Sequence, residues 1–231
     1  MPKECYITSA LAAEARSCAI LLSQASKRPA TTEFEMAKAI TIGVLALQGD
    51  YDAHRRRVEE LGAQAVLVRK PEELDSVDAL IIPGGESTTF LKFLEQDGFL
   101  SKLRDFVRAK PTFGTCAGAI LLAKEVGNPP QETLGVLDIA VRRNAYGRQL
   151  HSSIREGETS LGSSPMEMVF IRAPRIERVG KAVEVLARQG KDPVLVCQGK
   201  TMAATFHPEL SEDTRVHQAF LDLVRKSAAE T

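Results

Sequence analysis

A cysteine between two glycines is the residue whose setting most clearly suggests chemistry. Cys116 is the centre of GTCAG (114–118), which lies between a predicted strand and a predicted helix. This is the spacing of a nucleophile elbow, G-x-S-x-G, with sulfur in place of oxygen. Glycines suit the tight turn because backbone segments approach too closely there for a Cβ atom, and the N–H groups that begin the next helix stabilise a thiolate. The pattern predicts a reactive thiol; the alternative is a small buried cysteine in a tight corner.

His207 is the histidine best placed to serve such a thiol as a base. The stretch TMAATFHPEL (201–210) puts it where a predicted strand ends, followed by Pro208, which prevents further ladder pairing, and then by Glu209. Two-residue spacing in an extended segment sends both side chains the same way, so Glu209 would accept the imidazole N–H and fix its tautomer. Alone, the segment fits a surface His-Pro-Glu turn equally well. Together with the cysteine turn, it favours a catalytic Cys-His-Glu triad.

The other three histidines are predicted to be structural. His54 adjoins three arginines in a helical segment, a pattern that is typical of a solvated face. His151 falls in a polar loop and His217 in the last predicted helix.

A glycine turn provides a candidate site for stabilising negative charge. In ALIIPGGESTT (79–89) a predicted strand ends in Pro-Gly-Gly, and the backbone N–H groups there, including that of Gly85, would converge on an oxyanion. The second donor would be the N–H of Ala117, directly after the cysteine. A phosphate-binding loop is the rival interpretation, but neither G-x-x-x-x-G-K-[ST] nor G-x-G-x-x-G occurs in the sequence.

From residue 40 the sequence alternates between predicted strands and helices. ITIGVLAL (40–47) is an apolar run suited to a strand buried on both faces, and 50–62 has helical spacing between a capping Asp50 and Gly62. The other elements of this part are strands at 63–68, 77–83 and 110–114, helices across 87–109 with a break near Gly98, and a helix at 117–125. This order predicts an α/β fold with a parallel sheet, helices on both faces, and ligands at the carboxyl ends of the strands.

The later part of the chain is predicted to extend this sheet with antiparallel strands. Strand-like runs occur at 134–144, 166–174, 182–200 and 201–209, with turns at 189–192 and 198–200. A last helix is expected at about 214–226.

Composition limits the class of protein. The 231 residues are 44% apolar, enough for a substantial core, and 30 basic side chains balance 30 acidic ones, which argues against nucleic acid as a partner. The four cysteines show no CxxC pair or metal-ligand spacing, so a reducing, cytoplasmic setting fits best. No apolar run approaches the roughly 20 residues of a membrane span, so we expect a soluble protein and no membrane partner.

The first 38 residues differ from the rest of the chain. A short amphipathic segment (10–28) is followed by small and polar residues, which predicts a disordered extension at 1–38 ahead of a folded domain at 39–231. Glu14 and Arg16 interrupt what would be the apolar centre of a secretory signal, and several glutamates argue against a transit peptide. Translation upstream of a true start at Met36 is one explanation; an organelle-targeting role is the alternative.

Six motifs in order carry a family resemblance. LALQGD, PGGESTT, FGTCAG, RNAYGRQ, FIRAP and FHPEL occur between residues 40 and 226. Together they resemble the class I (triad) glutamine amidotransferases and, among these, the glutaminase subunits of the two-component pyridoxal 5′-phosphate synthases. The resemblance implies a flavodoxin-like α/β fold. It does not extend to residues 1–38, so it implies no role for them.

Carried over by motif, the resemblance implies roles for particular residues. Cys116 would attack the side-chain amide of glutamine, His207 would shuttle the proton and Glu209 would orient His207. Guanidinium groups suit the α-carboxylate of the substrate and Glu86 suits its α-ammonium group, with the choice between two arginines left open. Gln48, at the end of the first strand, is expected near the oxyanion loop and the contact with the synthase. The full set implied to hold glutamine is Gly85, Glu86, Ser87, Arg143, Ile171 and Arg172.

The resemblance also implies a place in a two-subunit enzyme. L-Glutamine would be hydrolysed to L-glutamate and ammonia without a metal or cofactor, and the ammonia would pass internally to a synthase subunit. That partner would combine it with ribose 5-phosphate and glyceraldehyde 3-phosphate to make pyridoxal 5′-phosphate, which is a product of the complex rather than a group bound by this chain. The glutaminase is expected to be nearly idle until its partner docks.

Three other functions compete with this one. Another triad amidotransferase, serving histidine or purine synthesis, would share the cysteine turn and His-x-Glu but is not expected to carry RNAYGRQ with FIRAP. An α/β-hydrolase would share the turn, although its acid usually precedes the histidine, whereas Glu209 follows His207. A non-catalytic binding subunit would keep only the fold, and the intact triad positions argue against it.

Overall fold

A computed structural model describes residues 40–143 and 153–230 of the chain. The extension predicted for residues 1–38, most of the RNAYGRQ motif and His151 lie outside these ranges. None of the helices within them is long and apolar enough to cross a membrane.

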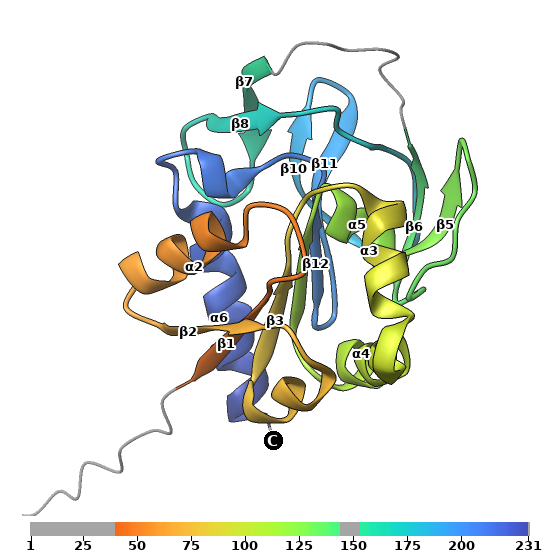
Figure 1. Ribbon diagram of the computed structural model, residues 1–231. Coiled ribbons are helices and arrows are strands. Elements are labelled where there is room, and N and C mark those ends of the chain that lie inside the picture. The colour runs from red at the N-terminus through yellow and green to blue at the C-terminus, as the bar shows by residue number, and fades with distance from the viewer. Residues whose placement is uncertain (1–39, 144–152, 231) are drawn as a thin grey trace, which may run out of the picture. The chain divides into compact units, whose positions relative to one another are not determined.

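A nine-stranded sheet forms the centre of the described fold (Figure 1). Its parallel part consists, in spatial order, of β2 (Gln64–Val68), β1 (Thr41–Leu45), β3 (Ala79–Ile82), β4 (Thr112–Thr115) and β12 (Thr201–Ala204). Its antiparallel part continues with β11 (Asp192–Gln198), β10 (Glu184–Gln189), β7 (Ser153–Thr159) and β8 (Met166–Phe170). The prediction of a parallel sheet with antiparallel additions is therefore confirmed.

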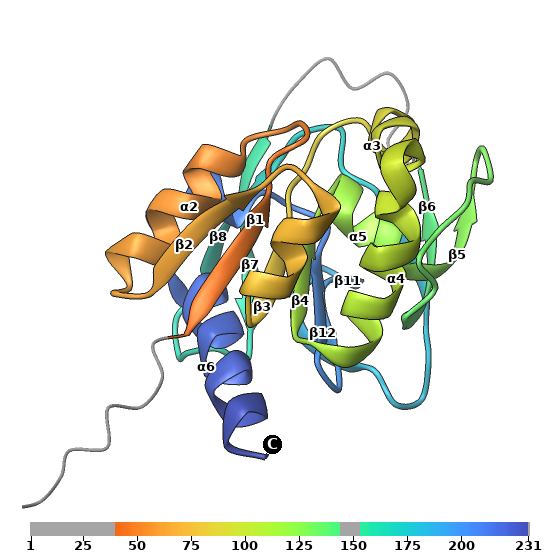
Figure 2. The same ribbon diagram turned by 60° about the horizontal axis from the view of Figure 1, so that its bottom comes forward.

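Helices cover both faces of this sheet (Figures 1 and 2). One face carries α2 (Tyr51–Glu60) and α6 (Arg215–Ala229); the other carries α3 (Ser87–Leu94), α4 (Phe99–Ala109) and α5 (Ala117–Leu122). Each face of the sheet has its own hydrophobic core. The strands contribute to both cores because successive side chains point to opposite faces. In β3, Ala79 and Ile81 pack in the core with α2 and α6, whereas Leu80 and Ile82 pack with α3, α4 and α5.

The predicted helix boundaries in the first half follow from local chemistry. The side chain of Asp50 accepts a hydrogen bond from the N–H of Ala53 (3.2 Å) at the start of α2, and Gly62 follows the helix with φ 76°. Gly98, with φ 72°, separates α3 from α4 at the predicted break, at the end of the short 3-10 helix η2 (Gln96–Gly98).

Several elements differ from the sequence prediction. The helix predicted at 117–125 ends at Leu122, and β5 (Ala123–Gly127) follows it directly. This strand pairs with β6 (Leu137–Arg142), which pairs with β9 (Arg175–Val179), in a second sheet of three strands. Strand pairing thus overrides the helical pattern of the segment. The strand predicted at 134–144 is therefore present as β6, but the expectation that it extends the main sheet is wrong. β7 and β9 were not predicted because their sequences, SIREGET and RIERV, are mostly polar and exposed.

The order of the parallel strands determines where the site lies. β1, β3, β4 and β12 are neighbours and run in the same direction, so the segments that follow them emerge at one edge of the sheet. These segments carry Gln48, the PGGES loop, Cys116 and His207, respectively. The residues expected to carry chemistry therefore follow the carboxyl ends of neighbouring strands, where ligands are expected in such a fold.

Candidate active site

Cys116 occupies a strained turn between β4 and α5. Its φ of 47° and ψ of −99° are unusual for a residue with a Cβ atom. The turn is fixed by two hydrogen bonds: the N–H of Cys116 donates to the carbonyl oxygen of Ala204 in β12 (2.9 Å), and its carbonyl accepts from the N–H of Ile120 (3.2 Å). The residue is 6% exposed. This is the strand-to-helix turn that the GTCAG spacing predicts.

The two glycines of the motif are required by close packing. A Cβ atom at Gly114 would lie 2.6 Å from the backbone of Gly118, and one at Gly118 would lie 2.1 Å from the carbonyl oxygen of Ile82 in β3. No ordinary Cβ atom approaches backbone within 3.0 Å. The start of α5 can therefore sit against β3 and β4 only because both positions lack a side chain.

His207 and Glu209 form a buried pair beyond the end of β12. The Nδ1 atom of His207 lies 2.7 Å from Oε1 of Glu209, and the backbone N–H of His207 donates to the carbonyl oxygen of Val169 in β8 (2.8 Å). Pro208–Leu210 forms a 3-10 turn, η3, so the expectation that an extended strand aligns the two side chains is wrong. Proline fits the first position of a helical turn, and the turn brings the carboxylate back to the ring.

Burial and hydrogen bonding set the charges of this pair. Burial by itself would lower the pKa of His207, but side-chain hydrogen bonds with Cys116 and Glu209 raise it to about 10. Burial likewise opposes ionisation of Glu209, but favourable electrostatics from the His54 and His207 rings and the hydrogen bond to His207 lower its pKa to about 2. At neutral pH Glu209 is therefore ionised and His207 protonated.

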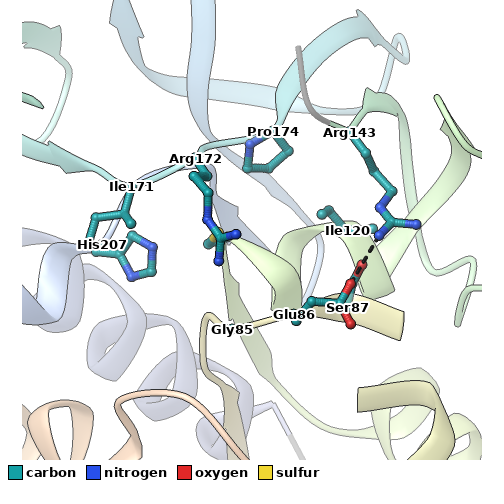
Figure 3. A pocket seen from close by; sticks show the side chains of 10 residues that line it. Gly85, Glu86, Ser87, Ile120, Arg143, Ile171, Arg172, Pro174 and His207 are labelled. Atoms are coloured by element: carbon teal, nitrogen blue, oxygen red, sulfur yellow. Dashed lines mark hydrogen bonds and ion pairs between the residues drawn. The ribbon is translucent and has the colours of Figure 1, made fainter. Parts of the chain in front are cut away.

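A pocket of about 160 Å³ opens over Cys116 and His207 (Figure 3). Several polar groups converge on it beside an imidazole with a perturbed pKa, which is typical of a small-molecule site. Its lining comes from segments that follow β3, β4, β6, β8 and β12, and from α3 and α5. The lining residues are Gly85, Glu86, Ser87, Cys116, Ile120, Arg143, Ile171, Arg172, Pro174 and His207. Of these, the sequence interpretation missed only Ile120 and Pro174.

Three residues singled out from the sequence lie just outside the lining. Glu209 is 3% exposed and lies behind His207, and Ala117 is fully buried at the first position of α5. Gln48 reaches the loop of the pocket, because its Nε2 donates to the carbonyl oxygen of Glu86 (2.6 Å). Its amide also lies against Gly85, whose φ of 137° is one that glycine adopts far more readily than other residues.

Glu86 joins the start of α3 to Arg143. Its carboxylate accepts hydrogen bonds from the backbone N–H groups of Thr88 (3.2 Å) and Thr89 (2.7 Å) and from both of their hydroxyls. The Nη2 atom of Arg143 lies 3.2 Å from Oε1 of Glu86 (Figure 3). Partial burial opposes ionisation of Glu86, but the threonine bonds lower its pKa to about 2. The carboxylate is thus ionised and already engaged, while Nη1 of Arg143 is buried without a hydrogen-bond partner among the described residues.

His54 is the main correction to the sequence interpretation. Its place beside three arginines suggested a solvated face, but the ring is fully buried. Its Nε2 atom lies 3.2 Å from Oε2 of Glu209 and 3.1 Å from Oγ1 of Thr115, and its Nδ1 atom lies 3.0 Å from Nε2 of His217. The signal was present in the sequence: His54, Val58 and Leu61 recur at i, i+4 and i+7, the spacing of the buried face of α2.

Metal binding finds no support within residues 40–143 and 153–230. No group of three or more His, Cys, Asp or Glu side chains there is arranged to hold a metal ion.

Solved structures define the class of this fold. A crystal structure described as a glutamine amidotransferase is similar, with a TM-score of 0.74 and 50% sequence identity, and the match covers 80% of this chain and 98% of that one. The structure of PurLQS from Thermotoga maritima has a TM-score of 0.59 at 17% identity, over 80% of this chain and 98% of that one, which shows a shared fold alone. The fold is that of the class I glutamine amidotransferases.

The sequence comparisons identify the family. Residues 44–226 match the model of the SNO glutamine amidotransferase family. A relative from Koribacter versatilis, named pyridoxal 5′-phosphate synthase subunit PdxT, is 65% identical over 184 residues, which are 80% of this chain and 95% of the relative. The protein of the same name from Solibacter usitatus is 51% identical over 186 residues, covering 78% of this chain and 97% of its own. The chain belongs to the SNO glutamine amidotransferase family, as the six motifs indicate.

Proposed function

We propose that this protein hydrolyses L-glutamine to L-glutamate and ammonia, with Cys116 as the nucleophile, His207 as the proton shuttle and Glu209 as the group that orients His207. The observation that carries the proposal is that Cys116 and His207 line the same pocket and that Nδ1 of His207 lies 2.7 Å from Oε1 of Glu209. Membership of an amidotransferase family supports the same reaction.

The first half of the reaction forms a thioester. The Cys116 thiolate attacks the side-chain amide carbon of glutamine and gives a tetrahedral intermediate. The N–H groups of Gly85 and Ala117 are the proposed donors to its oxyanion. The imidazolium of His207 then gives its proton to the leaving nitrogen, so that the C–N bond breaks and ammonia departs.

The second half regenerates the enzyme. Neutral His207 removes a proton from water, which attacks the thioester carbon through a second tetrahedral intermediate. Glutamate leaves when the C–S bond breaks, and the thiolate and the imidazolium are restored. Glu209 stays ionised throughout and stabilises the imidazolium, as the acid of a triad does.

The charges at the rim of the pocket suit an α-amino acid. Arg143 is already paired with Glu86, so Arg172, which extends over the pocket in Figure 3, brings the less compensated positive charge to the α-carboxylate. Glu86 is ionised even though it is bonded to Arg143 and to the start of α3, and it is the proposed partner of the α-ammonium group. The hydroxyl of Ser87 donates to Oε1 of Gln131 (2.7 Å), so its contribution to glutamine is assigned to its backbone N–H at the start of α3. Ile171 and Gly85 complete the set.

The destination of the ammonia follows from the named relatives. Two of them are subunits of pyridoxal 5′-phosphate synthase, and they match over almost their whole length. We therefore propose that this chain passes ammonia to a synthase subunit that makes pyridoxal 5′-phosphate from ribose 5-phosphate and glyceraldehyde 3-phosphate. We propose that Gln48, which donates a hydrogen bond to the carbonyl oxygen of Glu86, responds to that partner. The cytoplasm keeps free thiols such as that of Cys116 reduced, so we propose that the reaction takes place there.

The competing functions have less support. The alternative of an amidotransferase for purine synthesis is supported only by a similar fold at 17% sequence identity. An α/β-hydrolase is disfavoured because the acid follows the histidine in the chain. A non-catalytic subunit would have no need for the strained turn at Cys116 or for the buried pair of His207 and Glu209.

Glutamate release measured with and without the synthase subunit tests the proposal. We expect little release from the isolated chain and a large increase on adding the subunit, with no release from a Cys116→Ala variant. Equal rates with and without the subunit would reject activation by the partner. A Cys116→Ala protein that kept the original rate would reject the nucleophile.

A further inference from the structure

Two buried histidines continue the series of polar contacts behind Glu209. Oε1 of Glu209 bonds to His207, whereas Oε2 faces Nε2 of His54 at 3.2 Å. The other ring nitrogen of His54 lies 3.0 Å from Nε2 of His217 in α6. The side chains of His54 and Glu209 are fully buried, and His217 is 1% exposed. The established chemistry of a triad uses neither of these histidines.

His54 also contacts the strand that carries the nucleophile. Its Nε2 atom lies 3.1 Å from Oγ1 of Thr115, the residue directly before Cys116. The contact with Oε2 of Glu209 is close but bent, so that oxygen has no well-aligned hydrogen bond within the described residues. One ring therefore touches both the acid of the triad and the last residue of β4.

Hydrogen-bond accounting selects one proton arrangement. If His217 Nε2–H donates to Nδ1 of His54, then His54 Nε2–H points toward Glu209 and Thr115, and the ring nitrogen left without a partner, Nδ1 of His217, is an acceptor rather than a donor. The opposite arrangement buries an unpaired N–H on His217 and turns a lone pair of His54 toward the ionised oxygen of Glu209. An unpaired buried donor and a lone pair against a carboxylate both destabilise, so the first arrangement is favoured.

Nearby charges are consistent with neutral rings. Burial is the largest effect on both histidines: it lowers the pKa of His54 and helps lower that of His217 to about 3. At His54, Glu209 and Asp50 oppose the lowering of the pKa and His207 reinforces it. At His217, Glu209 opposes the lowering and Arg57 reinforces it. The pair thus offers Glu209 an N–H dipole without a second positive charge.

We propose that His54, held as its Nε2–H tautomer by His217, is a positioning residue that fixes the second oxygen of Glu209 and thereby holds the carboxylate against His207. This inference rests on the proposed glutaminase function and deepens it. His54 touches neither substrate nor the reacting atoms; it acts through Glu209. Its loss leaves Oε2 buried with poorer solvation, which makes Glu209 harder to ionise and weakens its hold on the imidazolium.

The pH dependence of glutamate release, measured with the synthase subunit present, tests this role. Removing the donor in His54→Leu should lower kcat about 10- to 100-fold, the effect typical of outer partners that orient imidazole ligands, with KM for glutamine little changed. A less ionised Glu209 moves the acidic limb of the profile to higher pH, and a weaker imidazolium moves the alkaline limb to lower pH. The pH range over which the variant is active should therefore become narrower. His54→Gln, whose amide N–H₂ reaches toward the position of Nε2, should recover most of the activity and most of the pH range over which the enzyme is active.

A matched control separates positioning from stability. Val224 is 2% exposed and lies on the same helix as His217, two turns away. Val224→Ala should lower the unfolding temperature but leave both limbs in place. A His54→Leu profile identical to that of the wild type would overturn the positioning role, and loss of activity in Cys116→Ala would show that the proposed function itself still stands. Activity retained in Cys116→Ala would instead reject the proposed function.

Ring-nitrogen NMR on the wild type tests the inference even if His54→Leu fails to fold. With four histidines in the chain, ¹⁵N-histidine labelling gives a spectrum that single substitutions can assign. We expect His54 to stay neutral with its proton on Nε2 between about pH 5 and 8, the range in which an ordinary histidine titrates. A proton on Nδ1, or a His54 that titrates in this range, would overturn the inference.

Discussion

Gly118→Ala tests whether close packing of α5 positions the nucleophile. Helix propensity alone predicts a gain, because alanine is better than glycine within a helix by up to about 1 kcal/mol. The structure predicts the opposite. The new Cβ would lie 2.1 Å from the carbonyl oxygen of Ile82, well below 3.0 Å, the shortest contact that Cβ atoms normally make. The obstacle is backbone within the sheet, which cannot rotate away as a flexible side chain can.

The expected magnitude follows from that distance. Relief of the clash requires α5 and β3 to separate by about 0.9 Å, the difference between these two distances. Overpacking of this kind costs about 1–3 kcal/mol, which outweighs the gain in propensity. The unfolding temperature should fall by about 2–4 °C for each kcal/mol lost in a domain of this size. Because the same turn carries Cys116 and Ala117, a shift approaching 1 Å should lower kcat about 100-fold.

Thermal unfolding and glutamate release, each measured on the same preparations, check both effects. Gly127→Ala is the matched control, since a Cβ atom at Gly127 meets nothing within 4 Å. That variant should change neither stability nor activity appreciably. A Gly118→Ala protein that is more stable than the wild type and fully active would refute the packing argument.

Three further predictions concern charge. The pKa of Glu209 is lowered from 4.5 to about 2, so its ionisation stabilises the fold above about pH 4.5, and this stabilisation is lost as the pH falls toward 2. Glu209→Gln should therefore make the free energy of unfolding in urea less sensitive to acid. An unchanged sensitivity would contradict the assignment of this charge to Glu209. The pKa of His207 is raised from 6.5 to about 10, so its protonation stabilises the fold fully below about pH 6.5, and this stabilisation is lost as the pH rises through 10. His207→Asn should reduce the fall in unfolding free energy at alkaline pH. The same fall in the variant and the wild type would contradict the assignment of this charge to His207. Arg172→Ala should raise KM for glutamine about 10- to 100-fold with little change in kcat, as expected for a charge-assisted hydrogen bond of about 1.5–3 kcal/mol, and steady-state kinetics giving an unchanged KM would exclude this role.

The fold was predictable where local pattern and burial agree. The strands β1 and β3 are apolar runs, Asp50 caps α2, and Gly98 separates two helices, so sequence chemistry alone indicates much of the parallel core. The segment 123–127 shows where this fails: it continues a helical pattern, but pairing with β6 pulls it into a strand. The polar strands β7 and β9 carry no apolar alternation from which they could have been recognised.

The site was predictable in its members but not in its supporting contacts. Motif spacing indicates Cys116, His207 and the glycine loop, because each follows a strand that must end at the same edge of the sheet. The turn that returns Glu209 to His207 is a 3-10 turn rather than a strand, which spacing cannot distinguish. The burial of His54 depends on α6, some 160 residues away in the chain, closing over α2.

Covalent trapping tests the central claim most directly. The protein, with its synthase subunit present, is treated with a glutamine-like electrophile, digested, and mapped by peptide mass. We predict a single label on the sulfur of Cys116, prevented by excess glutamine and strongly reduced in His207→Asn, since the free thiol reacts more slowly than the thiolate. A label on any other residue, or equal labelling of a Cys116→Ala protein, would contradict the claim that Cys116 is the nucleophile.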